Sequence, residues 1–227
     1  VADVGVAPQT QKGIFAFGSG SSDALVQISN LVSSSGVVAS NTTVTGTGRN
    51  YLAAASYGLD KAIFGYGSTG SVVSMSNLIS NIGVMASDVT GVGSARREIA
   101  AANYGTDKAI FGYGDTGSIV SLTNLVSSSG VVASDTTGVG TARQGLAAVG
   151  YGVDLAIFGY GRTTSAQASK SSITNKVSNT GIVATDTTGV GTARYDLAAT
   201  RYGVGLAIFA YGNPQDSATG ISNKVSN

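Results

Sequence analysis

The sequence predicts an all-β fold built from repeats, and three observations lead to that prediction. A phrase of the type Ile-Phe-Gly-Tyr-Gly recurs at steps of 49, 47, 47 and 51 residues, and its five copies begin at Ile14, Ile63, Ile110, Ile157 and Ile208. Between these phrases, short segments rich in β-branched residues alternate with Gly-rich turns, as is typical of antiparallel strands. No window keeps a 3.6-residue apolar period, so we expect essentially no helix.

One repeat shows the order of the expected elements. Within residues 96–142 the pattern predicts four strands, at 99–104, 108–113, 118–126 and 131–136, and the turns between them contain Gly, Asp, Ser or Thr. Four short strands in a repeat of about 40–50 residues are the pattern of one β-propeller blade. A β-helical solenoid is the alternative, but its coils normally take fewer residues.

The first two strands of each repeat differ in a way that fits a propeller. Alanine runs occupy the first strand, at 53–55, 100–102, 147–148 and 198–199. We place this strand innermost, where blades crowd together and side chains must be small. The Ile-Phe strand follows and reads as a nearly continuous apolar run, as expected for a strand covered on both faces.

Five copies of the Ile-Phe strand predict five blades of about 47 residues each in one domain, 1–227. The approximate blade limits are 1–48, 49–95, 96–142, 143–193 and 194–227. The last blade lacks a fourth strand. Residues 1–7 are expected either to form the inner strand of the first blade or to complete the last one, because an open edge is an aggregation hazard. A chain whose missing strand lies elsewhere is the other possibility.

The repeat resembles the kelch repeat. An Arg, a run of small apolar residues, a Gly-containing turn, Ile-Phe-x-Tyr-Gly and a Ser/Thr-rich third strand follow one another in the kelch order. Two departures make the likeness a divergent one: Tyr rather than Gly precedes Gly67 and Gly114, and the chain has no Trp. The resemblance implies a propeller fold and a binding role.

The amino-acid sequence of the repeats also resembles repeats in structural and tail-associated proteins of aquatic tailed phages. The phrases concerned are Asn-Leu-Val-Ser, Gly-Val-Val-Ala-Ser-Asp-Thr-Thr-Gly-Val-Gly-Thr-Ala-Arg and Lys-Ala-Ile-Phe-Gly-Tyr-Gly. This second resemblance implies a virion or otherwise extracellular location.

Composition narrows the classes of function. The chain has 13 basic and 12 acidic residues, a net charge of +1, and neither His nor Cys. We therefore expect no nucleic-acid partner, because such a balance offers no basic surface for phosphates. Membrane insertion is not expected either, since no apolar run approaches the ~18 residues that a span needs. No cofactor or metal site is expected, and thiolate or imidazole chemistry is impossible.

No catalytic group is recognisable, so we expect a protein that is not an enzyme. Ser and Thr are plentiful, but a Ser nucleophile needs a base and the chain has no His. Glu98 is the only glutamate, which leaves few pairs of carboxylates for glycoside hydrolysis.

Several residue sets recur once per repeat, and we interpret them as structural. An arginine precedes each of the last four Ile-Phe strands by 14 residues, at Arg49, Arg96, Arg143 and Arg194. We expect these arginines to bond carbonyls or a carboxylate of the next blade, with a polyanion-binding ring as the alternative. Asp88, Asp135 and Asp186 are explained by Asx turns rather than by calcium, which needs several oxygen ligands in one loop. The recurring tyrosines fit core and rim packing better than a sugar-stacking platform.

Positions that depart from the repeat are the better candidates for binding. The turn after the Ile-Phe strand varies most, and its first residues are Ser68, Asp115, Arg162 and Asn213. Loops on a rigid scaffold commonly carry binding sites, so we select these four.

Three functions remain open at this point. The first is a non-enzymatic structural or adhesive module that contacts other virion or surface proteins. The second is a lectin-like propeller with shallow sites between blades for a host-surface glycan. The third is an intracellular protein-interaction domain of the kelch type, for which a more charged face is expected.

Overall fold

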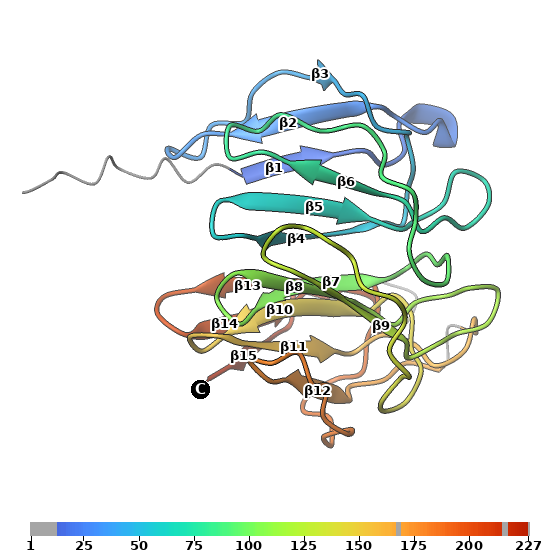
Figure 1. The fold of residues 1–227 in the computed structure, drawn as a ribbon. Coiled ribbons are helices and arrows are strands. Elements are labelled where there is room, and N and C mark those ends of the chain that lie inside the picture. The colour runs from blue at the N-terminus through green and yellow to red at the C-terminus, as the bar shows by residue number, and fades with distance from the viewer. Residues whose placement is uncertain (1–12, 167–168, 215–217, 227) are drawn as a thin grey trace, which may run out of the picture.

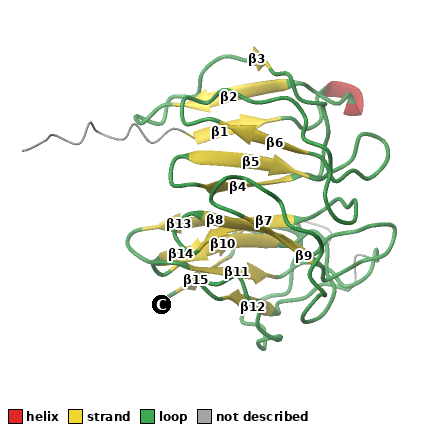
Figure 2. Ribbon diagram, in the orientation of Figure 1, coloured by secondary structure: helices red, strands yellow, loops and turns green. Residues whose placement is uncertain are grey.

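The architecture is all-β, as the sequence predicts. A computed structural model describes residues 13–166, 169–214 and 218–226. Over these ranges the chain forms five three-stranded antiparallel sheets, and Ser21–Asp23 forms one 3-10 turn (Figures 1 and 2). None of the described helical segments has the length and apolar character to cross a bilayer.

Each sheet is made of three strands that are consecutive in the chain. The first sheet contains β1 (Gly13–Ala16), β2 (Ile28–Val32) and β3 (Thr42–Thr43), and the second contains β4 (Ala53–Tyr57), β5 (Lys61–Gly65) and β6 (Ser76–Ile79). The third contains β7 (Ala100–Tyr104), β8 (Lys108–Gly112) and β9 (Thr123–Val126), and the fourth contains β10 (Ala147–Tyr151), β11 (Leu155–Gly159) and β12 (Thr174–Val177). The fifth contains β13 (Ala198–Tyr202), β14 (Leu206–Ala210) and β15 (Ser222–Val225).

The expected fourth strand is the main correction to the sequence prediction. In the third repeat the segment after β9 makes only two isolated bridges, Thr123↔Thr136 and Val126↔Val132. Between them the Asn124 side chain donates to Ala133 O at 3.0 Å, so a side chain takes a carbonyl that a regular ladder would use. In the second to fourth repeats the sheets are therefore three-stranded with a loosely bridged outer segment, and among the described residues only the first repeat keeps a two-residue strand, β3, there.

The third strand is also shorter than the expected 118–126. It covers only Thr123–Val126, because the chain bends sharply after β8. Tyr113 and Gly114 both have positive φ, 65° and 104°. The residues that follow form a tight turn, closed by the bridge Asp115↔Ile119, before β9 begins.

The alanine-rich strands of successive sheets lie side by side, in the order β4, β7, β10 and β13. Backbone hydrogen bonds join them at one end, where Glu98 N donates to Tyr51 O at 3.0 Å, Gly145 N to Glu98 O and Asp196 N to Gly145 O. A second set joins their hairpin turns, for example Gly105 N to Asp154 O at 2.7 Å. Small side chains permit this close approach, since a Cβ at Gly150 would lie 2.7 Å from the Asn103 side chain.

The apolar core lies between consecutive sheets rather than within one of them. Phe111 of β8 is buried against Tyr66, which directly follows β5, with ring centroids 5.2 Å apart. The same contact joins Tyr113 to Phe158 at 5.1 Å. Each sheet thus depends on its neighbours for burial, as in repeat proteins generally.

The last blade was expected to be closed by residues 1–7, and these lie outside the described residues. Within the described chain, β15 reaches Val225, and no strand of the first sheet pairs with it.

Candidate binding site

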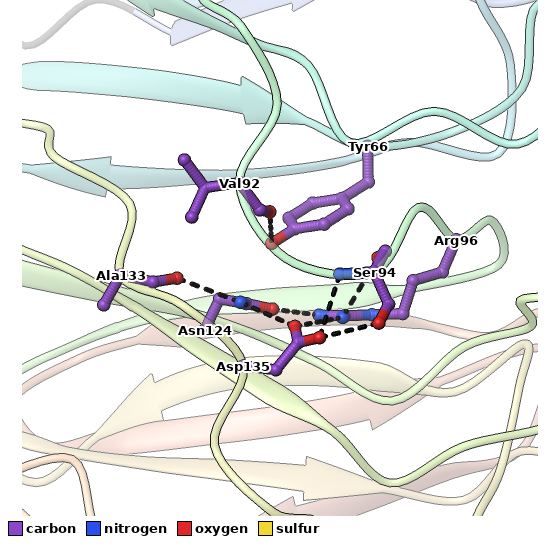
Figure 3. Close-up of polar contacts among 7 residues, drawn as sticks. All are labelled: Tyr66, Val92, Ser94, Arg96, Asn124, Ala133 and Asp135. Carbon is purple, nitrogen blue, oxygen red and sulfur yellow. Dashed lines mark hydrogen bonds and ion pairs between the residues drawn. The ribbon is translucent and has the colours of Figure 1, made fainter.

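The recurring arginines are buried in the junctions between sheets. Arg96 has no exposed side-chain surface, and its guanidinium carbon lies 4.6 Å from the centroid of the Tyr66 ring of the preceding repeat. The guanidinium donates to Asn124 Oδ1 and, at 3.2 Å, to Asp135 Oδ1 (Figure 3). Both partners belong to the repeat of Arg96 itself, whereas we had expected a carboxylate of the next blade.

Asp135 connects this junction to the linker that enters it. Its carboxylate accepts hydrogen bonds from Ser94 N at 2.9 Å and from Ser94 Oγ at 2.6 Å, as well as from Asn124 Nδ2 at 2.9 Å (Figure 3). These contacts are long-range, so the local Asx turn expected for Asp135 is not what holds it. Burial opposes ionisation here, but the hydrogen bonds of Ser94 and Asn124 and the charge of Arg96 prevail and lower the pKa of Asp135.

The junctions vary around a common plan. Arg143 lies over Tyr113 at 4.8 Å with Asp186 at 3.7 Å, and Arg49 lies over Phe17 at 4.4 Å. Burial lowers the pKa of Arg49 to about 10, although Asp88 opposes the shift. Arg194 lies over Tyr160 at 4.1 Å and donates to backbone carbonyls of Thr192 and Phe209. All four guanidinium groups are fully buried, so they face neighbouring sheets and not a soluble polyanion.

The four residues selected for binding all lie at one end of the sheets. We call it the loop end and define it by residues 50–51, 68–70, 97–98, 115–117, 144–145, 162–165, 195–196 and 213–214. Each selected residue forms a backbone bridge to the residue that directly follows the buried arginine of its own repeat, in the pairs Asn50↔Ser68, Arg97↔Asp115, Gln144↔Arg162 and Tyr195↔Asn213. The structure thus places them at equivalent positions, one per sheet, in the second to fifth repeats.

Two of the four have side chains that are already engaged. Ser68 is buried, and its hydroxyl accepts a hydrogen bond from Gly70 N at 3.2 Å. Asp115 is buried as well, accepting from Gly117 N at 2.8 Å and from Arg97 Nε at 3.1 Å. Arg97 keeps nearly half of its side chain exposed, so the outward-facing charge in that repeat belongs to Arg97.

Arg162 is the centre of an ionic cluster, and its ion pair with Glu98 is the only one between repeats in the described part of the chain. Its guanidinium donates to both carboxylate oxygens of Glu98, at 2.9 and 3.2 Å, and lies 4.9 Å from the centroid of the Tyr195 ring. With its amide oxygen turned toward Arg162, Gln144 accepts from Arg162 Nε at 3.0 Å. Arg162 comes from the fourth repeat, Glu98 from the third and Tyr195 from the fifth, so the cluster joins three sheets.

Sequence reasoning missed Glu98 and Asp196 as members of this site. They occupy equivalent places, two residues after the buried arginine, together with Tyr51 and Gly145. All four have φ between 50° and 59°, a left-handed conformation that is uncommon outside Gly and Asn or Asp. A comparison of that repeat position would have pointed to them, since it holds Tyr, Glu, Gly and Asp in the four repeats.

Asp196 adds a second carboxylate beside the ion pair. Partial burial and the negative charge of Glu98 raise the pKa of Asp196, while Arg162 opposes the rise. Asp196 itself remains exposed to solvent. The loop end therefore presents an exposed acid next to a satisfied Arg–Glu pair, an arrangement that suits hydrogen bonding to polar ligands.

Metal ligation has little support in the described part of the chain. No group of three or more His, Cys, Asp or Glu residues converges there. The sequence itself has no His or Cys, the commonest ligands of transition metals.

Two hollows lie away from the loop end, beside the outer strands. One, of about 490 Å³, is lined by residues of the fourth repeat and by Ser226, among them Tyr151, Lys176 and Thr180. The other, of about 210 Å³, lies between the third and fourth repeats and includes Thr123, Thr136 and Thr180. Apolar atoms make up most of both linings, and Ser, Thr or Tyr hydroxyls are interspersed among them.

Comparison of the sequence with models of protein families produced no match, and comparison with curated proteins produced none either. The repeated junctions and the loop-end cluster are therefore the features from which function is inferred.

Proposed function

We propose that the chain is a non-enzymatic binding module with a structural or adhesive role. In this proposal its five sheets are the blades of a divergent kelch-like propeller. The rigid junctions hold the blades, and the loop end contacts a partner, which is another virion or surface protein. The observation that carries the proposal is a contrast between the junctions and the loop end. The junctions contain the same buried residue, arginine, in four repeats. At the loop end the equivalent position differs in each repeat, and its residues are Ser68, Asp115, Arg162 and Asn213.

A binding role fits this contrast better than catalysis does. Both carboxylate oxygens of Glu98 accept hydrogen bonds from Arg162, so the only glutamate of the chain is already engaged by a cation. Asp196 cannot be paired with a histidine base or a cysteine nucleophile, because the chain contains neither residue. Rigid loops that differ from blade to blade instead suit specific recognition.

The virion location is proposed from the resemblance of the repeat phrases to those of tailed phages. Mass spectrometry of purified particles, set against soluble and membrane fractions of the same culture, tests it. The protein should be enriched in the particles. Its absence from them would refute the virion location and leave the fold untouched.

The loop end is tested by substitution. Arg97→Ser changes an exposed charge there, and Val204→Ser is the matched control, because Val204 is almost fully exposed in a hairpin turn at the opposite end. Cross-linking in intact particles, followed by mass spectrometry, should lose its partner peptides with Arg97→Ser and keep them with Val204→Ser. Equal loss, or no loss, would place the contact elsewhere.

A glycan-binding module is the second candidate, favoured by two hollows that combine apolar side chains with the hydroxyls of residues such as Tyr151, Thr136 and Thr180. A labelled sample of the protein on a broad glycan array distinguishes the two candidates. Binding that is abolished by Thr180→Val, a residue common to both hollows, and unchanged by Arg97→Ser would favour the glycan. An array without signal would remove this candidate.

A further inference from the structure

The junction between two sheets has a fixed aromatic pattern. An aromatic residue just after the Ile-Phe strand of one sheet meets a phenylalanine on the Ile-Phe strand of the next, edge to face in three pairs and tilted in the fourth. The four pairs are Phe17–Phe64 at 5.9 Å, Tyr66–Phe111 at 5.2 Å, Tyr113–Phe158 at 5.1 Å and Tyr160–Phe209 at 5.3 Å. Nearly all of these rings are buried, so each junction consists of one projecting ring and one receiving site.

The two ends of the array each retain one half of this junction. Phe15 of β1 corresponds to the projecting phenylalanines, yet it is 64% exposed. Tyr211, which directly follows β14, corresponds to the receiving aromatics and is also 64% exposed. Elsewhere in the array the receiving tyrosines, Tyr66, Tyr113 and Tyr160, are at most 2% exposed.

The receiving site on the fifth sheet, formed by Ala210 and Tyr211, has the right size for a phenylalanine. In three junctions the projecting ring lies on a glycine, for example Phe111 on Gly65, but the last site has Ala210 there. The first junction shows that alanine is accepted at this place. Ala16 stands there, and Phe64 packs 5.9 Å from Phe17, somewhat farther out than its counterparts.

Backbone polar groups of the fifth sheet, the last in the array, are also unpaired. Within the described residues, Gly203 N makes none of the bonds to a following sheet that Gly58, Gly105 and Gly152 make. Tyr202 is 38% exposed, whereas its counterparts in β4, β7 and β10 are buried. Among the described residues, no sheet covers this face of the fifth sheet in the way that the third, fourth and fifth sheets cover the sheets before them.

We propose that the first sheet of a second copy of this chain docks on that face, with Phe15 of the second copy on Ala210 and against Tyr211. The occupant is a second copy because Phe15 repeats the phenylalanine of the four internal junctions, whereas within one chain Phe15 and Tyr211 are both 64% exposed and so do not cover one another. Such a contact is head-to-tail, so it produces closed rings or open filaments according to the rotation between copies. This inference goes beyond the proposed binding role, and it requires that the first and fifth sheets do not close a ring within one chain.

Sedimentation velocity of the full chain, at concentrations from about 1 to about 200 µM, tests the association. The unmodified protein should form species larger than a monomer as its concentration rises. Phe15→Ser and Tyr211→Ser should each weaken association at least about 30-fold, as expected for aromatic residues at the centre of an interface. Val204→Ser, which removes an apolar side chain that is 98% exposed in a hairpin turn, should leave association unchanged.

Mixing the two variants gives the sharper result. Phe15→Ser keeps an intact receiving face, and Tyr211→Ser keeps an intact projecting face. Alone, each should remain a monomer, and their equimolar mixture should form a dimer and nothing larger. Circular dichroism melting of each variant checks that folding is retained, which is expected because both side chains are exposed.

Three outcomes would overturn the proposal. A protein that stays monomeric at the highest concentration has no such contact. A monomer whose melting temperature falls by the same amount with Phe15→Ser and with Tyr211→Ser closes the junction within one chain. Association that survives in either variant alone uses a different surface.

Discussion

Phe158 of the fourth sheet lies directly on Gly112 of the third, so closely that a Cβ at position 112 would be 2.6 Å from Phe158 Cζ. The same relation joins Phe111 to Gly65 and Phe209 to Gly159. These glycines set the spacing between sheets and explain why the Ile-Phe-Gly phrase recurs.

Gly112→Ala should therefore destabilise the protein by about 1–3 kcal/mol, the usual cost of overpacking a core. Urea denaturation followed by circular dichroism measures the change. Gly220→Ala is the control, because a Cβ there meets no atom within 4 Å, and its effect should stay within about 0.5 kcal/mol. Equal effects of the two substitutions would contradict the close contact.

Asp135→Asn should lower the free energy of unfolding at pH 7 by about 2 kcal/mol, because it removes a charge-assisted partner of the buried Arg96. Asp60→Asn is a control of the same chemistry, since Asp60 lies in an exposed hairpin turn. Denaturation curves that coincide for these two variants would show that the junction does not need the carboxylate.

Acid should weaken the junctions. Hydrogen bonds and the nearby arginines, working against burial, lower the pKa values of Asp88, Asp135 and Asp186 below the ordinary 3.8. A depressed native pKa stabilises the fold above pH 3.8, and this stabilisation is lost as pH falls through the native values. Unfolding free energies measured from pH 7 down to about pH 2 should fall less steeply for Asp135→Asn than for the unmodified protein.

Asp196 should show the opposite dependence. Its pKa is raised in the folded state, chiefly by burial and then by Glu98, so the folded protein holds this proton more tightly than the unfolded chain does. Stability from this group is present at low pH and declines as pH rises from 3.8 through the native value. Asp196→Asn should remove the decline and gain stability relative to the unmodified protein between pH 4 and pH 7. An unchanged difference across that range would exclude the raised pKa.

Arg162→Lys should weaken the loop-end cluster by about 1 kcal/mol, since an ammonium cannot bind both oxygens of Glu98 and lie over Tyr195 at once. A double-mutant cycle with Glu98→Gln isolates the pair. A coupling energy near zero would show that Arg162 and Glu98 act separately.

The repeat period, the strand order within each sheet and the absence of long helices could all be predicted from the sequence, because turn glycines and the Ile-Phe phrase signal them locally. The side-by-side placement of the alanine strands followed from the size of the alanine side chain. The fourth strand was predicted wrongly. Its apolar pattern is suitable for a strand, but the Asn124 side chain takes the Ala133 carbonyl, and no local pattern signals that competition.

The loop-end site could be predicted only in part. Ser68, Asp115, Arg162 and Asn213 were selected because they break the repeat at one turn, and the structure shows that they occupy equivalent positions; their role in binding stays a prediction. Glu98 and Asp196 were missed, since their proximity to Arg162 depends on how three successive sheets curve around the alanine strands. Such curvature arises from tertiary packing, which spacing along the chain does not encode directly.

The buried arginine junction also bears on how such a chain changes over generations. The phrase Asp-Thr-Thr-Gly-Val-Gly-Thr-Ala-Arg occurs twice without change, ending at Arg143 and at Arg194, and each copy leads into the same junction. Unequal recombination between the two gene segments would add or delete one whole sheet together with a complete set of its contacts. The number of sheets is thus a heritable variable that selection can adjust, while the face presented by each sheet diversifies separately at the loop end.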